Sequence, residues 1–170
     1  MIKIDTRETY ITIVEEYSDM LFRIAYQNML HRYDAEDIVQ DVLVKLLKNK
    51  ELVFDDEQHL KNWLIRVTIN QCKNLKKVMH RHTEVALEDD IYSFTQEEES
   101  IFAELIKLPE ESRNILYLYY YEGYSIKEIA DIMQKSINTI SSRLSRARIK
   151  LRKILEEENR WVYIKMRWIE

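Results

Sequence analysis

The chain has very few of the residues that make tight turns. Its 170 residues include one glycine and one proline, whereas average usage gives roughly 12 and roughly 8 in a chain of this length. Tight β-hairpins and glycine-rich phosphate loops depend on residues that adopt positive φ. The scarcity therefore excludes sandwiches, barrels and Walker-type nucleotide sites, and it predicts an all-α protein.

Cysteine and long apolar runs are also scarce. Cys72 is the only cysteine, so neither a disulfide within the chain nor a cysteine-rich zinc cluster can form, and we expect a small buried side chain. No apolar run approaches the roughly 20 residues that cross a bilayer. Residues 1–5 lack the apolar core of a signal peptide. We therefore expect a cytoplasmic protein that is not inserted in a membrane.

The residues that are present suit small helical domains with segregated charge. Hydrophobic residues make up 46% of the chain and charged residues 33%, enough for a core and a polar surface. The net charge of −4 hides blocks of opposite sign: residues 58–83 and 133–155 contain no acid but several Lys and Arg. Between them, residues 84–104 contain eight acids and no Lys or Arg. Any single run of charge is commonly a solvated helix face, but the alternation predicts two small helical domains, 1–83 and 101–158, an acidic linker, 84–100, and a tail of unknown role, 159–170.

The first two helices are predicted from apolar residues at three- and four-residue steps. The first stripe is Tyr10, Ile13, Val14, Tyr17, Leu21 and Ile24. The second helix is expected to begin at Asp34, which can cap free amides, and to bury Ala35, Ile38, Val39, Val42 and Leu46. The same spacing aligns a polar stripe on its outer face, suited to docking a partner: Asp37, Gln40, Asp41 and Lys48.

A third helix is predicted from about Leu60 to Met79. Its expected buried residues are Leu60, Trp63, Leu64, Val67, Leu75 and Val78. Amides and cations share another face: Asn62, Arg66, Asn70, Lys73 and Lys77. Such a stripe suits nucleic acid, because Asn can hydrogen-bond base edges while Arg and Lys neutralise phosphates.

The C-terminal half is predicted to contain a helix-turn-helix. A short helix near residues 101–106 precedes another that begins at Pro109 and ends near Gly123. Ser125 and Glu128 have the spacing of a capping box, and Ser136 can cap a longer helix. The stripe of that last helix is Ile140, Leu144, Ala147, Leu151 and Ile154. Two helices separated by a tight turn define the motif.

The outward side chains of the last helix are the candidate DNA-binding residues, because the second helix of this motif enters the major groove. Those suited to base edges are Asn138, Ser141, Ser142, Ser145 and Arg146. Arg146 can form a bidentate contact with guanine, whereas serines discriminate weakly. Those suited to backbone phosphates are Lys135, Thr139, Arg143 and Arg148.

Three segments together resemble a known family. The sequence from Asp34 to Asp41 resembles the helix by which bacterial sigma factors bind core RNA polymerase, and that from Trp63 to Asn70 looks like the next helix of the family. Residues 108–148 look like the C-terminal DNA-reading domain. The resemblance spans about residues 10–155, and the compact arrangement is similar to the extracytoplasmic-function (ECF) group of the sigma-70 family.

The resemblance implies a specificity subunit of RNA polymerase, without catalytic residues, cofactor, metal or small-molecule substrate. Its N-terminal domain would dock on core polymerase through the polar stripe of the second helix and hold the melted −10 strand through that of the third. Its C-terminal domain would read the −35 duplex, with Ser141, Ser142, Ser145 and Arg146 at base-reaching positions. A loop near residues 52–59 would receive an unstacked base, and an anti-sigma factor would be a partner.

The sequence departs from the family pattern at two positions of the second domain. Gln134 stands where the family usually has the turn glycine, so we expect another turn geometry or a strained positive φ. Ser141 stands where a basic residue is common.

Two other classes of protein remain open from the residues alone. A helix-turn-helix regulator that is not a polymerase subunit explains the second domain but gives the helix from Asp34 to Asp41 no role. A metal-dependent enzyme would draw on His59, His80 and His82, but these histidines lack accompanying ligands at a suitable spacing.

Overall fold

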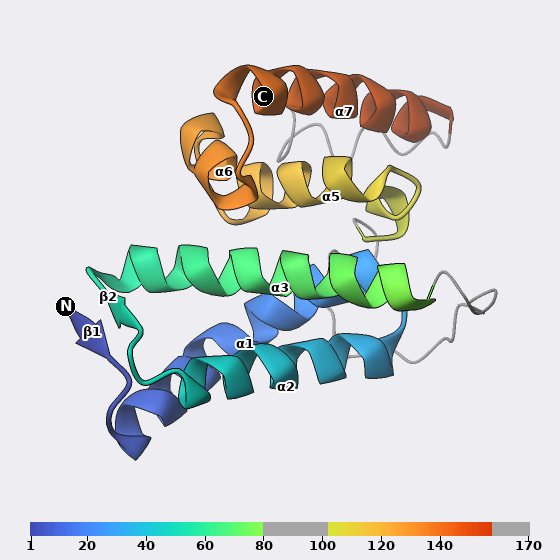
Figure 1. Cartoon of the computed structure of the whole chain (residues 1–170). Coiled ribbons are helices and arrows are strands. Elements are labelled where there is room, and N and C mark those ends of the chain that lie inside the picture. The colour runs from blue at the N-terminus through green and yellow to red at the C-terminus, as the bar shows by residue number, and fades with distance from the viewer. Residues whose placement is uncertain (80–101, 158–170) are drawn as a thin grey trace. The chain divides into compact units, whose positions relative to one another are not determined.

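The computed structural model describes residues 1–79 and 102–157. The chain divides into two compact units, Met1–Tyr92 and Ser93–Glu170 (Figure 1). Over the two described ranges the all-α expectation is confirmed, apart from one pair of two-residue strands. The predicted acidic linker and C-terminal tail, with His80 and His82, lie outside the described residues.

The first unit contains three helices that pack against one another: α1 (Arg7–Met29), α2 (Arg32–Lys48) and α3 (Glu57–Met79). Thr6 caps α1 through a hydrogen bond that its Oγ1 accepts from the Thr9 amide at 3.1 Å. The core of the unit contains the predicted stripes of α1 and α2, since their central members are buried: Ile13, Tyr17, Leu21, Ile24, Ala35, Ile38, Val39, Val42 and Leu46. The periodicity therefore identified the inner faces of both helices.

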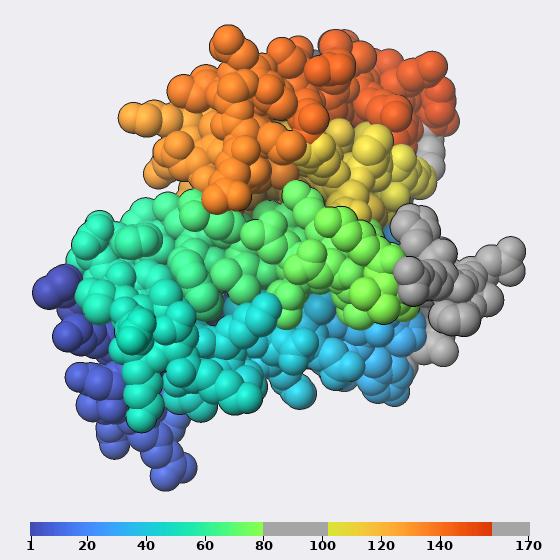
Figure 2. Space-filling view, in the orientation of Figure 1, coloured from blue at the N-terminus to red at the C-terminus, as the bar shows by residue number. Residues whose placement is uncertain are grey.

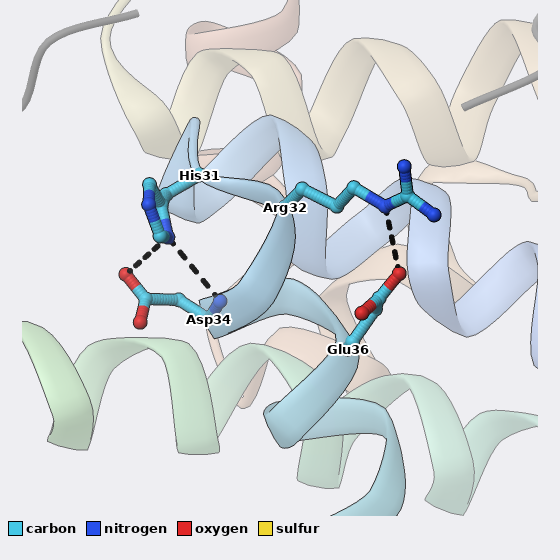
Figure 3. Close-up of polar contacts among 4 residues, drawn as sticks. All are labelled: His31, Arg32, Asp34 and Glu36. Carbon is cyan, nitrogen blue, oxygen red and sulfur yellow. Dashed lines mark hydrogen bonds and ion pairs between the residues drawn. The ribbon is translucent and has the colours of Figure 1, made fainter. Parts of the chain in front are cut away.

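The start of α2 differs from the prediction. The helix begins at Arg32, and its N-cap is His31, whose Nδ1 accepts from the Asp34 amide at 3.4 Å (Figure 3). Asp34 lies instead in the first turn, where a carboxylate favours the positive end of the helix dipole. The expected Asp34 cap is wrong, because the imidazole three residues upstream, on extended backbone, supplies the acceptor. Arg32 Nε donates to Glu36 Oε1 at 2.8 Å across the next turn.

The third helix begins earlier than predicted and buries a different set of residues. Asp56 Oδ1 accepts from the His59 amide at 2.7 Å, which caps the helix before Glu57. Trp63 is only half-buried, and Val78 is 69% exposed, so the prediction that Val78 is buried is wrong. Val78 follows the buried Cys72 by six residues, a step that turns the side chain about 120° away from it. The buried residues of α3 are Leu60, Leu64, Ile65, Thr68, Ile69 and Cys72.

A short antiparallel ribbon joins the chain start to the loop before α3. Strand β1 (Ile2–Lys3) pairs with β2 (Val53–Phe54), with Ile2 opposite Phe54. Phe54 is 1% exposed, and its ring packs edge-on against those of His59 and Trp63 at centroid distances of 5.4 and 5.7 Å. Part of the loop that was expected at residues 52–59 is therefore a strand.

The second unit begins with helical residues 102–105 and continues through α5 (Glu110–Leu116) into η1, a π-helix of Tyr117–Tyr121. Pro109 is the N-cap of α5, as its missing N–H allows. The amide of Glu122 donates to the Tyr117 carbonyl at 3.1 Å and closes the wider π turn. Gly123 then adopts a φ of 74°, so the predicted helix end is confirmed.

Helices α6 (Ile126–Met133) and α7 (Ile137–Glu157) form the predicted helix-turn-helix. Ser125 Oγ accepts from the Glu128 amide at 3.3 Å, and Glu128 Oε2 accepts from the Ser125 amide at 2.8 Å, which confirms the capping box. Gln134 adopts the left-handed conformation with a φ of 54°, so glutamine makes the turn that glycine usually makes. Ser136 Oγ accepts from the Thr139 amide at 3.1 Å and caps α7.

The inner face of α7 matches the predicted stripe except at its end. Ile140, Leu144, Ala147 and Leu151 are buried, as expected. The last buried residue is Leu155, whereas Ile154 is only half-buried. A four-residue step from Leu151 keeps the side chain on the inner face, and the predicted three-residue step places it at the edge.

Candidate docking and nucleic-acid surfaces

The outer face of α2 is the first candidate surface. The four predicted docking residues, Asp37, Gln40, Asp41 and Lys48, are all exposed. Figure 2 shows α2 at the surface of the first unit, along its lower border in this view. Because the opposite face of the helix supplies the core, these side chains are presented together on one side.

The same face of α2 also exposes apolar side chains that the sequence analysis did not assign to it. Tyr33 is 58% exposed, Val44 41% and Leu47 46%. Val44 and Leu47 lie seven residues after Asp37 and Gln40, and a seven-residue step returns to the same helix face. The surface is therefore mixed rather than predominantly polar. The spacing of apolar residues did not reveal these exposed side chains, because α2 has apolar residues on both its inner and its outer face.

The polar stripe of α3 is the second candidate surface. Asn70 and Lys77 are exposed, while Asn62, Arg66 and Lys73 are half-buried. Their three- and four-residue steps place all five on one face. Asn62 Oδ1 accepts from Gln58 Nε2 at 2.8 Å, which orients the Asn62 amide. The structure thus aligns amides and cations along the helix as predicted.

The outer face of α7 is the third candidate surface. Asn138, Ser141, Ser142, Ser145 and Arg146 are all exposed, on the side opposite the buried stripe. Arg146 Nε donates to the Ser142 carbonyl at 3.2 Å, which holds the guanidinium along the helix. Lys135 is exposed and Thr139 half-buried at the N-terminal end of the helix. The early part of α7 therefore presents a polar surface of the kind that base edges and phosphates can contact.

Two of the predicted phosphate contacts have partners inside the second unit. Arg143 Nη1 forms an ion pair with Glu111 Oε2 of α5. Arg148 Nε donates to Tyr120 Oη at 2.5 Å. The sequence places both arginines among charged neighbours and gives no sign of these contacts, because each partner lies more than twenty residues away.

The strongest titration shift in the first unit is a burial effect in its core. Burial is the main cause that raises the pKa of Tyr17 to about 12, and the neighbouring Glu16 adds to it. The phenol therefore stays neutral at physiological pH. It is a packing group rather than an acid or base.

Of the three histidines of the alternative metal site, only His59 lies within the described residues. In the described ranges, no three His, Cys, Asp or Glu side chains are grouped so that they could hold a metal ion. His59 Nδ1 accepts from the Asp55 amide at 3.2 Å, which uses the ring to order the loop before α3. Every helix within residues 1–79 and 102–157 is too short or too polar to span a bilayer.

Comparison with known proteins finds two family profiles that match the chain. The profile of Sigma-70 region 2 matches residues 13–81, and that of Sigma-70, region 4 matches residues 98–151. RNA polymerase sigma factor SigV of Bacillus subtilis is 31% identical, over 88% of this chain and 92% of SigV. ECF RNA polymerase sigma factor SigW of the same organism is 25% identical, over 92% and 94%.

Two solved structures share the fold. The sigma factor RpoE from Bartonella quintana, solved in complex with the anti-sigma factor NepR, superposes with a TM-score of 0.69 at 24% identity. The match covers 88% of this chain and 98% of RpoE. CnrH, in complex with the cytosolic domain of CnrY, gives a TM-score of 0.63 at 23% identity over 90% and 91% of the two chains.

The two helical units and the capped helix-turn-helix define a DNA-binding protein, and its N-terminal unit exposes a separate face of α2 with polar and apolar side chains. That combination matches both sigma-70 profiles in order. The chain belongs to the sigma-70 family of RNA polymerase sigma factors, in the ECF group. It directs promoter-specific transcription initiation. Neither a free-standing regulator nor a metal-dependent enzyme would account for the match to both sigma-70 regions. Sigma factors are specificity subunits and catalyse no reaction.

Proposed function

We propose that the two units divide promoter recognition between them. Residues 1–83 bind core RNA polymerase and the melted −10 strand, and residues 101–158 read the −35 duplex. The observation that carries this division is the presentation of three separate exposed surfaces by α2, α3 and α7, the first two in one unit and the third in the other.

Core polymerase docks on the outer face of α2. Asp37, Gln40, Asp41 and Lys48 supply charge and hydrogen bonds that set the orientation. Val44 and Leu47 add apolar area at the centre of the same face. A mixed surface of this kind has the pattern of a stable protein interface, with an apolar centre and polar surroundings.

The −10 strand lies along α3. Lys73, Lys77 and Arg66 neutralise its phosphates, while Asn62 and Asn70 offer amides to base edges. The loop that ends at the N-terminus of α3 is ordered by Phe54 and His59. This ordered loop is where we place the unstacked base, since contacts between the base and the loop offset the cost of unstacking.

The −35 duplex is read by the first half of α7. Arg146 and the exposed Asn138, Ser141, Ser142 and Ser145 face the major groove, and Lys135 and Thr139 contact the backbone beside it. The serines carry little discrimination alone, so Arg146 is the principal reader. Arg143 and Arg148, the other two predicted phosphate contacts, have partners within the second unit.

An anti-sigma factor is the expected regulatory partner, and the cytoplasm is the expected location. Both structural relatives were solved in complex with a protein partner, RpoE with the anti-sigma factor NepR and CnrH with the cytosolic domain of CnrY. A chain that docks on core polymerase has to share its compartment. The exposed α2 face is also the surface that an inhibitor has to cover to block docking.

The test is a pull-down of the purified chain with bacterial core polymerase, followed by run-off transcription on a genomic promoter library. Stable binding and new promoter-specific transcripts are the expected result, and the transcripts define the −10 and −35 sequences. Failure to bind core polymerase, with any co-purified inhibitor removed, would instead favour a free-standing helix-turn-helix regulator.

A further inference from the structure

We propose that Arg148 is a positioning residue for −35 recognition, which fixes the rotation of α7 through two tyrosines of the π-helix instead of neutralising a DNA phosphate. The inference rests on the proposed −35 role of α7. It assigns a function to the Tyr117–Tyr121 segment, which the promoter-binding surfaces leave without one.

The contact has three components. Arg148 Nε donates to Tyr120 Oη at 2.5 Å. The central carbon of the guanidinium lies 5.1 Å from the ring centroid of Tyr119 and 5.4 Å from that of Tyr120. Arginine over an aromatic face gains cation–π attraction in addition to the hydrogen bond. A guanidinium held in this way has lost much of the freedom that a phosphate contact at the surface requires.

The π-helix explains how two adjacent tyrosines reach one guanidinium. In a regular helix neighbouring side chains diverge by about 100°, whereas a π turn inserts a residue and changes the local direction. The rings of Tyr119 and Tyr120 stand edge to face, 4.9 Å apart at 77°, and form two walls beside Arg148. Tyr117 and Tyr121 stabilise the turn, with their rings stacked at 5.0 Å. Tyr117 Oη also donates to Glu122 Oε1 at 2.9 Å.

The position of Arg148 in α7 links this contact to DNA reading. Arg146 precedes it by two residues, and side chains two apart on a helix point to nearly opposite sides. An anchor at Arg148 therefore determines the direction in which Arg146 points. The ion pair between Arg143 and Glu111 ties the same helix to α5 at a second point. With both contacts made, α7 cannot rotate about its axis without breaking one of them.

The experiment compares Arg148→Gln, Tyr120→Phe and the double variant in reconstituted holoenzyme, on a promoter selected by the run-off screen. Binding is measured against salt and against the same promoter with a scrambled −35 element. We expect each single variant to lose about 3- to 10-fold in affinity, and the double variant to lose no more than Arg148→Gln. In these variants the preference for the intact −35 element should fall, because the Arg146 side chain is no longer held in the direction of the DNA bases.

The salt dependence separates positioning from phosphate contact. Lys135→Gln, a proposed phosphate contact, should reduce the slope of log affinity against log salt by about 0.9, whereas Arg148→Gln should leave it unchanged. A similar reduction for Arg148→Gln, or additive losses in the double variant, would overturn the proposal. Lys150→Gln, an exposed change on the same helix, is the matched control.

Two further results keep the test decisive. Arg148→Gln could unfold the second unit, and in that case Tyr120→Phe, which removes a single oxygen, is used alone. The preference of this variant for the intact −35 element is then compared with that of the wild type. An unchanged preference contradicts the positioning role. If the wild-type holoenzyme selects no promoter, the proposed function is contradicted. The proposed role of Arg148 is then contradicted too, because it depends on that function.

Discussion

Arginine has two uses on the same helix. Arg146 lies exposed along α7, with Nε donating to the Ser142 carbonyl, while Arg148 turns inward to Tyr120. The charge is identical, but its free-energy contribution depends on its surroundings. An exposed guanidinium remains available to guanine, and an inward one contributes hydrogen bonding and aromatic contact within the unit.

Arg146→Ala is the first prediction at this scale. The substitution should weaken binding to the −35 duplex by about 1 to 3 kcal/mol, because it removes a bidentate contact to guanine. Titration of the holoenzyme with the selected promoter measures the loss. Lys153→Ala, exposed near the end of the same helix, is the control and should bind like the wild type. Unchanged affinity for the Arg146 variant would remove it from the readers.

The capping box gives a pH prediction. Hydrogen bonds from the Ser125 side chain, and then from its backbone, lower the pKa of the Glu128 carboxyl. A carboxyl whose pKa is lower in the folded state stabilises the fold above its unfolded pKa, and this contribution disappears as the pH falls through the folded value. Ser125→Ala should cost about 1 kcal/mol of unfolding free energy at neutral pH.

The difference between wild type and Ser125→Ala should then shrink as the pH falls below the ordinary range of a glutamate carboxyl. Urea unfolding at neutral and acid pH measures both values. Ser145→Ala removes an exposed serine from the middle of α7 and is the control. A difference that does not change with pH would show that the Glu128 carboxylate has no part in the cap.

At the scale of elements, the decisive features are ends and turns. Leu30 after α1 and Gln134 after α6 both adopt left-handed backbone, at φ 57° and 54°. Side chains with a Cβ meet a steric penalty there, and glycine does not. The two helices of the DNA-reading motif therefore meet at a strained residue, which the Ser136 cap of α7 and the buried faces of both helices keep in place.

Gln134→Gly should raise the unfolding free energy of the second unit by about 0.5 to 1 kcal/mol, since relief of the left-handed strain exceeds the added chain entropy. Thermal or urea unfolding checks the value. Lys150→Gly places the same residue in the exposed interior of α7 and should instead destabilise by about 1 kcal/mol. A loss of stability at both positions would mean that the turn carries no such strain.

At the scale of the whole molecule, each unit has its own core and its own candidate surfaces. The first unit is stabilised by the packing of α1, α2 and α3, and the second by that of α5, η1, α6 and α7. The blocks of charge along the chain follow this division. Separate cores allow a substitution in one unit to leave the other folded, so polymerase docking and −35 reading should be separable.

Asp41→Lys should weaken binding to core polymerase while the affinity of the chain for the −35 duplex stays within error. The change reverses an exposed charge on the outer face of α2, where a charge of the wrong sign makes contacts with the polymerase unfavourable. Pull-down with core polymerase and titration with the duplex measure the two effects. Glu15→Lys, the same change on the exposed side of α1, is the matched control. Equal loss of both activities would contradict the division of labour.

Local sequence was enough to predict most of the helices and the caps at Ser125 and Ser136, but not the cap of α2. The stripes of α1, α2 and α7, the capping box at Ser125 and the turn at Gln134 all depend on residues within a few positions of one another. Local spacing fixes which side chains share a helix face. For this reason the predicted polar residues of α2 and the predicted base-reading residues of α7 are all exposed, whereas the exposed Val44 and Leu47 were missed.

Contacts between different helices and strands could be known only from the tertiary structure. The pairing of Ile2 with Phe54, the exposure of Val78 and the inward direction of Arg148 each depend on a segment distant in sequence. Helical periodicity gives the direction of a side chain but not what lies opposite it. An arginine is equally compatible with a phosphate or a tyrosine pair, and the packing of α7 against α5 and α6 leaves Arg148 in contact with Tyr119 and Tyr120.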